Sequence, residues 1–359
     1  MIYTFSEVLE IHNGKNQRNV ENKNGNYPIY GSGGIIGFAD KYLCDEPAVI
    51  IGRKGSINNP LFVDKPFWNV DTAFALVPNS SLLDVRYLYY FCLSYNFNVL
   101  STTVTIPSLT KFNLLKVKIE VPSLEEQKQI VHKLDKIEMI IGLKERQLKD
   151  LEGFIRSRFL EMFGDIQHNP CKWDIEPLSA VCHKITDGEH GSVQRVSEGY
   201  VYLNAKNIRQ DGNIDWENIT HISFKDHAKI FKRCNPEPDD ILLTTTGTVG
   251  NIAIVPKVGP FSIDRGITLL KINNDRLNNI YLANLLNSEY LQQCMKNNIH
   301  ASAIGHLFLK QVKSLSVMLP PLHLQNQFAD YVVHIDKSKY GGTIFLRLLE
   351  IFAYVVIYK

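Results

Sequence analysis

The 359-residue sequence has no surplus of charge of either sign. Lys and Arg total 39, Asp and Glu total 37, and the formal net charge is +2. This balance excludes a strongly basic nucleic-acid tail, and the 45% hydrophobic content excludes a disordered chain. Nucleic-acid binding stays open, because a balanced total can contain a local basic surface. The length predicts two or three domains.

Cysteine is scarce and follows no pattern. The six cysteines include no C-x-x-C pair, so we expect neither a metal site nor a disulfide framework. The opening segment, MIYTFSEVLEIH, carries acidic residues and no long apolar run, and it therefore does not predict a secretory signal. We expect a cytoplasmic protein with reduced thiols and no membrane association.

Motifs for catalysis are also missing. The glycine-rich run Gly31–Gly37 resembles a dinucleotide-binding loop, but Ile36 occupies the place of the third glycine. The sequence contains no G-x-x-x-x-G-K-[ST] loop, no H-E-x-x-H pair and no G-x-S-x-G nucleophile elbow. We therefore predict no catalytic residues and no cofactor bound by this chain.

An internal repeat is the main positive feature. The segment from Asp45 to Gly55 resembles that from Asp239 to Gly250, because each is a short apolar run that ends in G-x-x-G. Aligned this way, Gly52 and Gly55 match Gly247 and Gly250 at an offset of 195 residues, Asp71 matches Asp264 at 193, and Tyr87-Leu88 matches Tyr281-Leu282 at 194.

The longest repeated block lies further downstream. Ile106-Pro-Ser-Leu109 and the run from Val117 to Gln129 reappear as Ile304-Gly-His-Leu307 and the run from Leu315 to Gln327, 198 residues later. Offsets confined to 193–198 across three blocks indicate a duplicated unit.

Each unit follows one plan. Short β-rich runs broken by turn residues come first, a helical stretch follows near residues 87–100 or 280–297, and an alternating strand then leads to a proline and a helix. This order predicts an α+β fold. The predicted parts are an N-terminal module (1–122), a central helix (123–164), a C-terminal module (165–320), the start of a second helix (321–340) and a divergent apolar tail (341–359).

The central helix begins with a capping box, Ser123 to Glu126. An unbroken helix over residues 123–163 would be about 60 Å long. Its narrow apolar seam favours packing against one partner helix over burial in an ordinary globular core. The seam comprises Ile130, Leu134, Ile137, Ile141, Leu148, Leu151, Ile155 and Met162, and the second helix offers Phe328, Val332 and Ile335 as partners.

The second helix departs from the first after residue 340. We expect Gly341-Gly342 to interrupt it, at a cost of roughly 1 kcal/mol per glycine. The remaining residues carry only Arg347, Glu350 and Lys359 as charges. We interpret them as a foreign or shifted end that replaces the second half of the helix, with an amphipathic membrane anchor as the alternative.

Two divergent modules, each ending in Ile/Val-x-Val/Leu-Pro-x-Leu-x-x-Gln-x-Gln and followed by a helix, resemble the specificity subunit of type I restriction–modification enzymes. The resemblance spans residues 1 to about 340. It rests on Ile119–Ile130 with the helix to Phe163, Val317–Phe328, Gly164-Asp165 and Trp173-x-x-x-x-Leu178.

The resemblance implies that each module is a target recognition domain that reads one half of a bipartite, asymmetric site in double-stranded DNA. It also implies an antiparallel coiled coil of the two helices, which sets the half-site spacing and docks methyltransferase subunits. Those subunits would bind S-adenosylmethionine and methylate adenine, and a restriction subunit would use ATP and Mg. Two alternatives remain: a duplicated, non-catalytic interaction scaffold, or an inactive specificity subunit with a truncated second helix.

Candidate DNA contacts lie in the turns that follow the repeated β runs. Arg and Lys bond guanine edges or phosphates, and hydroxyls bond bases or backbone. Neither module has a strongly basic block, which predicts modest phosphate affinity for the chain alone. The candidates are Arg53, Lys54, Ser56, Thr102, Thr103 and Lys111 in the N-terminal module, and Lys206, Arg209, Thr245, Thr246, Thr248, Arg265, His300, Ser302 and Lys310 in the C-terminal module.

Overall fold

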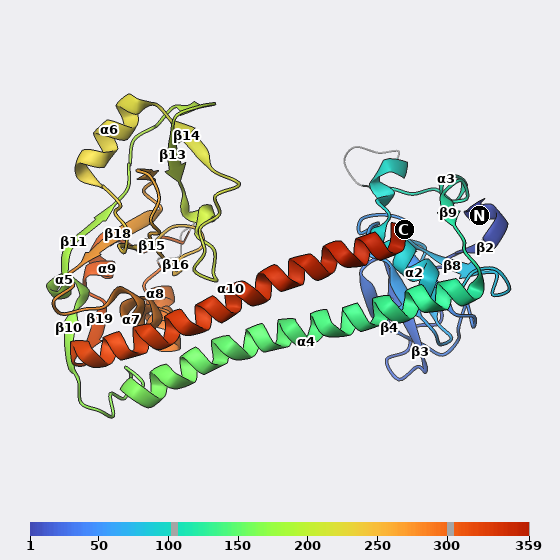
Figure 1. The fold of residues 1–359 in the computed structure, drawn as a ribbon, viewed down its shortest axis with the longest axis horizontal. Coiled ribbons are helices and arrows are strands. Elements are labelled where there is room, and N and C mark those ends of the chain that lie inside the picture. The colour runs from blue at the N-terminus through green and yellow to red at the C-terminus, as the bar shows by residue number, and fades with distance from the viewer. Residues whose placement is uncertain (102–106, 300–304, 359) are drawn as a thin grey trace. The chain divides into compact units, whose positions relative to one another are not determined.

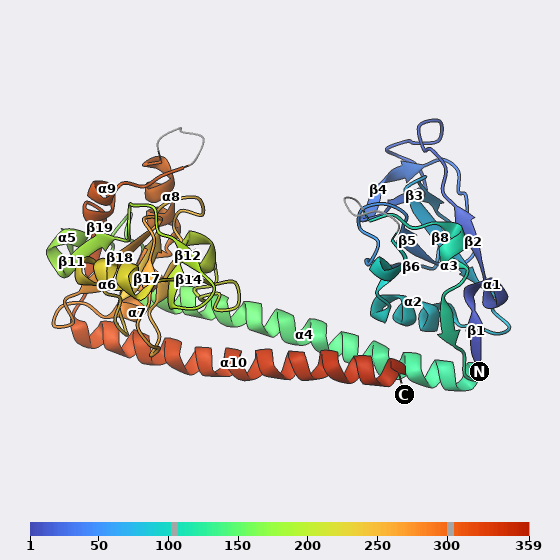
Figure 2. The ribbon, with the colours of Figure 1, turned by 90° about the horizontal axis from the view of Figure 1, so that it is seen from above.

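The computed structural model describes residues 1–101, 107–299 and 305–358 (Figures 1 and 2). The chain forms two compact units. Unit 1 combines Met1–Arg146 with Gly342–Lys359, and unit 2 comprises Gln147–Gly341. Each unit therefore holds one module together with half of each of two long helices, α4 (Leu124–Phe163) and α10 (Leu322–Tyr358).

The N-terminal module is built on a four-stranded antiparallel sheet whose order is β2-β8-β5-β6. Its inner strands are fully apolar runs, and their side chains are buried on both faces of the sheet. A β4-β3-β7 sheet and a β1-β9 pair complete the module. The elements are β1 (Ile2–Thr4), α1 (Phe5–Val8), β2 (Leu9–Asn13), β3 (Tyr27–Gly31), β4 (Gly34–Ala39), β5 (Ala48–Gly52), β6 (Leu61–Val63), β7 (Trp68–Asn69), β8 (Ala73–Pro78), α2 (Val85–Ser94), η1 (Phe97–Leu100), α3 (Lys111–Leu114) and β9 (Lys118–Glu120).

The C-terminal module repeats this plan. Its central sheet has the order β11-β18-β15-β16, beside a β12-β14-β13-β17 sheet and a β10-β19 pair. The elements are β10 (Asp174–Pro177), α5 (Leu178–Val181), β11 (Cys182–Asp187), β12 (Arg195–Val196), β13 (Tyr200–Leu203), η2 (Ala205–Asn207), β14 (Thr220–Ile222), α6 (Phe224–Arg233), β15 (Ile241–Thr244), β16 (Ile252–Ile254), β17 (Ser262–Ile263), β18 (Ile267–Ile272), α7 (Asn279–Leu286), α8 (Glu289–Asn297), α9 (Leu309–Lys313) and β19 (Ser316–Leu319).

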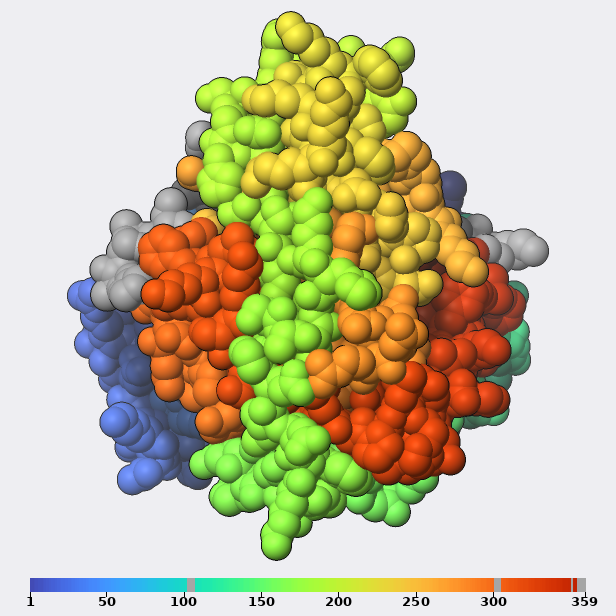
Figure 3. Space-filling view, turned by 90° about the vertical axis from the view of Figure 1, so that its left-hand side faces the viewer, coloured from blue at the N-terminus to red at the C-terminus, as the bar shows by residue number. Residues whose placement is uncertain are grey.

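The α+β fold with a repeated module is thus confirmed, and the two copies differ mainly by one insertion. β11 begins 173 residues after β2, whereas β15 begins 193 residues after β5. The extra residues include α6, which lies against the second sheet of the module and is drawn in yellow at the top of Figure 3. The corresponding segment between β2 and β5 is fully described and contains no helix.

The start of α4 has the predicted capping box. The Ser123 N–H donates to Glu126 Oε2 at 2.9 Å, and the Glu126 N–H donates to Ser123 Oγ at 3.3 Å. The hydroxyl and then the amide of Ser123 lower the pKa of the Glu126 carboxyl by hydrogen bonding to its charged form. The repeated proline is therefore followed, in this copy, by a fully capped helix end.

The repeated glutamine attaches each long helix to its module. Gln127 is buried, accepts the Asp84 N–H at 2.8 Å and donates to the carbonyls of Leu82 and Pro122. Gln325 makes the equivalent bonds with the Asn278 N–H and with the carbonyls of Arg276 and Pro320. A buried amide with three bonds holds the start of each long helix against the N-terminus of α2 or α7.

The long helices pack against each other inside each unit (Figures 1 and 2). In unit 1, Leu134 and Ile137 of α4 are buried beside Tyr90, and Ile130, Ile141, Leu349 and Ala353 pack against them. In unit 2, Phe163 contacts Phe328 while Glu152 pairs with Lys339 at 3.3 Å, so the helices run antiparallel there. The core of unit 2 contains Ile155, Phe159, Phe163, Phe328, Val332 and Ile335, with Leu151 and Met162 partly buried against it; Leu148 is half-buried.

The predicted interruption at Gly341-Gly342 is wrong, because α10 continues to Tyr358. A glycine removes side-chain contacts and adds backbone entropy, but it keeps the N–H and C=O that the helix needs. The contacts of Leu349 and Ala353 with the apolar face of α4 help to offset this cost. Among the described residues, no helix is long and apolar enough to cross a membrane.

Candidate nucleic-acid interface

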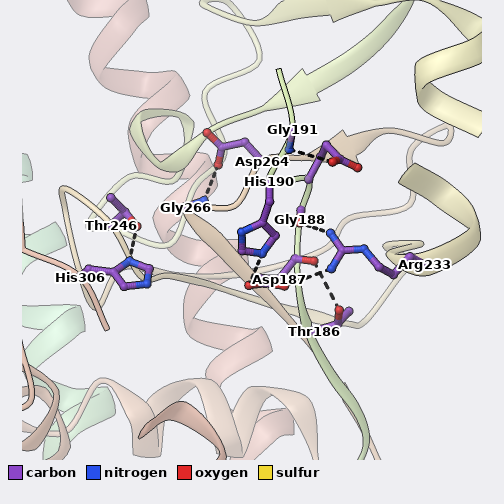
Figure 4. A network of polar contacts seen from close by, with 11 residues as sticks. Thr186, Asp187, Gly188, His190, Gly191, Arg233, Thr246, Asp264, Gly266 and His306 are labelled. Atoms are coloured by element: carbon purple, nitrogen blue, oxygen red, sulfur yellow. Dashed lines mark hydrogen bonds and ion pairs between the residues drawn. The ribbon is translucent and has the colours of Figure 1, made fainter. Parts of the chain in front are cut away.

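Four segments of the C-terminal module meet at one edge of its central sheet. β11 ends there at Asp187, β15 ends at Thr244, and β18 begins at Ile267, because antiparallel neighbours bring alternate ends together. We call this surface the C-terminal rim; it consists of Asp187–Gly191, Thr245–Thr248, Asp264–Gly266 and Gly305–His306 (Figure 4).

Basic side chains neutralise the carboxylates at this rim. Arg233, from the end of α6, donates to the carbonyl oxygen of Gly188 and lies 3.2 Å from Asp187 Oδ1. The second Asp187 oxygen lies 2.7 Å from His190 Nε2 (Figure 4). Glu189 lies 3.9 Å from Lys229 Nζ, also on α6. These pairs reduce the repulsion that exposed carboxylates would exert on an approaching phosphate.

The rim also requires one close backbone approach. Gly188 sits so near the segment before β18 that an added Cβ would lie 2.1 Å from the carbonyl oxygen of Ile263. The neighbouring Asp264 carboxylate accepts the Gly266 N–H at 2.9 Å, and burial raises the pKa of Asp264. Gly188 therefore lets the loop after β11 pack against the Asp264 turn.

A threonine and a histidine face outward at the centre of this rim. Thr246 Oγ1 lies 2.8 Å from His306 Nδ1, and the His306 ring meets the Phe308 ring edge to face at 4.6 Å. Both residues are half-buried. The hydroxyl and the aromatic ring together restrict the orientation of the imidazole.

The N-terminal module has an equivalent N-terminal rim, which consists of Arg53–Ser56, Asp71–Thr72 and Pro107–Ser108. The Arg53 N–H donates to the Thr72 carbonyl, and the Gly55 N–H donates to the Pro107 carbonyl. In the C-terminal rim the Thr245 N–H donates to Gly266, and the Gly247 N–H donates to Gly305. The same backbone bonds thus build both rims.

These bonds correct the predicted alignment of the repeat. Gly55 (φ 81°) matches Gly247 (φ 73°) at an offset of 192 residues, and not Gly250. Strand pairing agrees, since Gly52 faces Ala73 and Thr244 faces Ile267. The G-x-x-G letters favoured the wrong register, because Gly250 belongs to a separate turn whose N–H donates to Thr244.

The structure brings most of the described candidates to the two rims. Arg53, Lys54 and Ser56 are exposed on the N-terminal rim, and Arg265 and Thr248 are exposed on the C-terminal rim. Thr248 Oγ1 lies 3.4 Å from the Ala205 carbonyl oxygen, so the turn of exposed Lys206 adjoins that rim.

Other candidates are less available. The Thr245 side chain is only 1% exposed, so it drops out of the proposed contacts. Arg209 pairs with Asp215 at 3.2 Å, and Lys111 donates to the Ile11 carbonyl at 2.7 Å. Lys310 is exposed on α9. The candidates Thr102, Thr103, His300 and Ser302 lie outside the described residues.

Sequence reasoning missed His190, Arg233 and His306. The first two meet through contacts between separate elements, which the sequence pattern does not reveal. His306, however, stands in the block repeated at an offset of 198, at the position of Ser108, and the repeat could have indicated it. Within the described ranges, no group of three or more His, Cys, Asp or Glu side chains could hold a metal ion.

Comparison with known proteins identifies the family. The pattern of the family described as type I restriction modification DNA specificity domain matches residues 1–153 and 186–340. The protein assigned as the MjaX specificity subunit of Methanocaldococcus jannaschii is 25% identical over 286 residues, which is 73% of this chain and 63% of that protein. The EcoBI specificity subunit of Escherichia coli is 22% identical over 331 residues, 84% of this chain and 69% of that protein.

Solved structures show the same fold. The type I restriction–modification S subunit from M. genitalium superposes with a TM-score of 0.58 at 17% identity, covering 99% of this chain and 94% of that one. A chain from a study of complex assembly and conformational transition of the type I system gives a TM-score of 0.61 at 15% identity, with 99% and 96% covered. With both copies of the family pattern present, the chain belongs to the family of type I restriction–modification DNA specificity subunits.

Proposed function

We propose that this chain reads a bipartite, asymmetric DNA site, one half with each module, as the non-catalytic specificity subunit of a type I restriction–modification complex. The observation that carries the proposal is the pair of rims, built by equivalent backbone bonds but presenting different side chains. Two different readers in one chain favour a site whose halves differ, unlike the palindrome read by a symmetric dimer.

The rims supply two kinds of contact. Arg53, Lys54, Lys206 and Arg265 are exposed and basic, and such side chains bond phosphates or guanine edges. Hydroxyl and imidazole groups, such as those of Thr246 and His306, bond base edges. Pairing of Asp187 and Glu189 with basic groups allows the phosphate backbone to approach the C-terminal rim.

The remaining functions belong to partner chains. We expect two methyltransferase subunits that bind S-adenosylmethionine to dock on the α4–α10 pair, and a restriction subunit to use ATP and Mg. Joining two modest readers in one molecule raises the effective concentration at the second half-site. We expect the complex to work in the cytoplasm, where the free cysteines stay reduced.

The alternatives have lost support. Truncation of the second helix was the only reason to expect an inactive subunit, and α10 is continuous and packed against α4. A duplicated scaffold that binds protein or glycan has no specific observation in its favour.

The test is reconstitution with the methyltransferase encoded beside this chain. We expect a stable complex that transfers methyl groups to adenine in DNA and binds that DNA less tightly as salt rises. The methyltransferase alone is the control. A stable complex that neither binds nor methylates any DNA would contradict the proposal.

A further inference from the structure

One backbone feature occurs at the same place in both rims. Residues 54 and 108 form an isolated antiparallel bridge in the N-terminal module, and residues 246 and 306 form its counterpart in the C-terminal module. We call these two contacts the rim bridges. Each joins the turn after the central strand (β5 or β15) to the segment that precedes α3 or α9.

The backbone of the rim bridges is held in the same way in both modules. The Leu109 N–H donates to the Arg53 carbonyl at 2.9 Å, and the Leu307 N–H donates to the Thr245 carbonyl at 2.8 Å. Leu109 and Leu307 are each 1% exposed in the core of their own module. The repeat thus keeps the leucine anchor while the residue before it changes from serine to histidine.

The position of the bridge residues favours contact with a ligand. Directly opposed residues of an antiparallel pair project to the same face, and neighbours along a strand project to opposite faces. Because Leu109 and Leu307 point into the core, Ser108 and His306 point outward together with Lys54 and Thr246. The 2.8 Å contact between Thr246 and His306 agrees with this geometry (Figure 4).

The two rim bridges carry different chemistry on one scaffold. Lys54 is an exposed donor beside the Ser108 hydroxyl. In the C-terminal module, Thr246 and Phe308 orient the His306 ring through Nδ1 and one ring face, and Nε2 is the second nitrogen available for a base edge. A fixed backbone with exchanged side chains is the arrangement expected where two readers share a frame and differ in sequence preference.

We propose that the rim bridges determine base specificity: Lys54 with Ser108 in one half-site, and His306, positioned by Thr246, in the other. This inference rests on the proposed function and names the residues through which it acts. Lysine is suited to the acceptors of guanine. His306 reads a single base edge as donor or acceptor, according to the ring tautomer that Thr246 stabilises.

The experiment maps N6-methyladenine in a host that lacks adenine methylation, with the full chain co-expressed with its methyltransferase. Lys54→Ala should relax one base of the N-terminal half-site, and His306→Ala should relax one base of the C-terminal half-site. Each should lose about 5- to 150-fold discrimination, the range of one good base contact. The other half-site serves as the internal control. Thr246→Val should weaken the same base preference as His306→Ala.

Matched controls remove a lysine from the opposite end of each sheet. Lys65 follows β6 and Lys257 follows β16, both exposed. Lys65→Ala and Lys257→Ala should leave the methylated motif unchanged. An unchanged motif with Lys54→Ala and with His306→Ala would overturn the inference.

Complete loss of methylation by His306→Ala, in a complex that still co-purifies, is resolved by His306→Gln. That variant keeps a polar side chain of similar reach. An altered base in the C-terminal half-site then supports the inference, and an unchanged motif overturns it. If the wild-type complex itself methylates nothing, the proposed function fails, which is a different result from either variant outcome.

Discussion

The two modules share a fold but are attached to the long helices by different chemistry. Both use a buried glutamine, Gln127 or Gln325, and a tyrosine hydroxyl, of Tyr87 or Tyr281, that donates to a strand carbonyl. Beyond this common frame, the N-terminal attachment is polar and the C-terminal attachment is aromatic.

The N-terminal attachment is an ion-pair network between α2 and α4. Arg86 lies 2.5 Å from Asp135 Oδ1 and 5.0 Å above the Phe62 ring. The Tyr90 hydroxyl lies 2.6 Å from the same Asp135 oxygen and 2.9 Å from Glu138. Burial, and then these carboxylates, raise the pKa of Tyr90, so the phenol stays protonated as a donor.

The C-terminal attachment is a cluster of four rings. Phe159 stacks on Tyr281 at 5.5 Å, Phe163 meets Tyr281 at 4.8 Å, and both phenylalanines contact Phe328 edge to face. At the positions of Arg86, Tyr90 and Asp135 this copy has Ile280, Asn284 and Val333. The comparison teaches that the glutamine frame preserves the architecture while the surrounding contacts diverge from ions to rings.

The largest expected effect is on the aromatic side. Phe328→Ala should lower the free energy of unfolding of the C-terminal module by about 3–5 kcal/mol, because it empties a fully buried site. The matched change Ile130→Ala, at the same position of α4, should cost less than half of this, because Ile130 is only partly buried. Hydrogen exchange of peptides from the full chain measures both modules separately; equal losses would break the comparison.

The shared glutamine should give equal effects in the two modules. Gln127→Leu and Gln325→Leu each leave a buried N–H and two carbonyls without partners, and each should cost about 1–3 kcal/mol in its own module. The second glutamine of each motif supplies the control, since Gln129 and Gln327 are exposed and their change to Leu should cost little. Unequal losses would show that the frame is not equivalent in the two copies.

The polar attachment should respond to salt. Asp135→Asn should destabilise the N-terminal module by at most about 1 kcal/mol at low ionic strength, because the pair is partly exposed. The loss should shrink in 1 M salt, where charges are screened beyond about 3 Å. Val333→Ala, at the matching position of α10, should show no such dependence; urea unfolding at two salt concentrations tests the pair.

The smallest expected effect concerns the capping box. Folding lowers the pKa of Glu126, so its stabilising contribution is present above the ordinary value of 4.5 and is lost as the pH falls through the folded value. Glu126→Gln should remove this acid-dependent part of α4 stability, and the neighbouring Glu125→Gln should not. Hydrogen exchange at the start of α4 between pH 7 and pH 4 measures the difference, and identical pH profiles would contradict the assignment.

Repetition explains how much could be predicted from the sequence. Pro122, Gln127 and Tyr87 recur because each makes a contact within the frame, so the duplicated architecture and the helix that follows each module were readable. The ring cluster was missed because a strict seam from Ile155 to Met162 passes over Phe159 and Phe163. The burial of Thr245 and the meeting of His190, Asp187 and Arg233 depend on how separate elements pack, which the chain order alone does not specify.

The measurement that tests the account most directly is the N6-methyladenine map of a host carrying the wild-type chain and its methyltransferase. The account predicts one split motif whose two halves differ, with methylated adenine absent when this chain is omitted. A palindromic or unsplit motif, or the same methylation without this chain, would contradict the claim that its two modules read two half-sites.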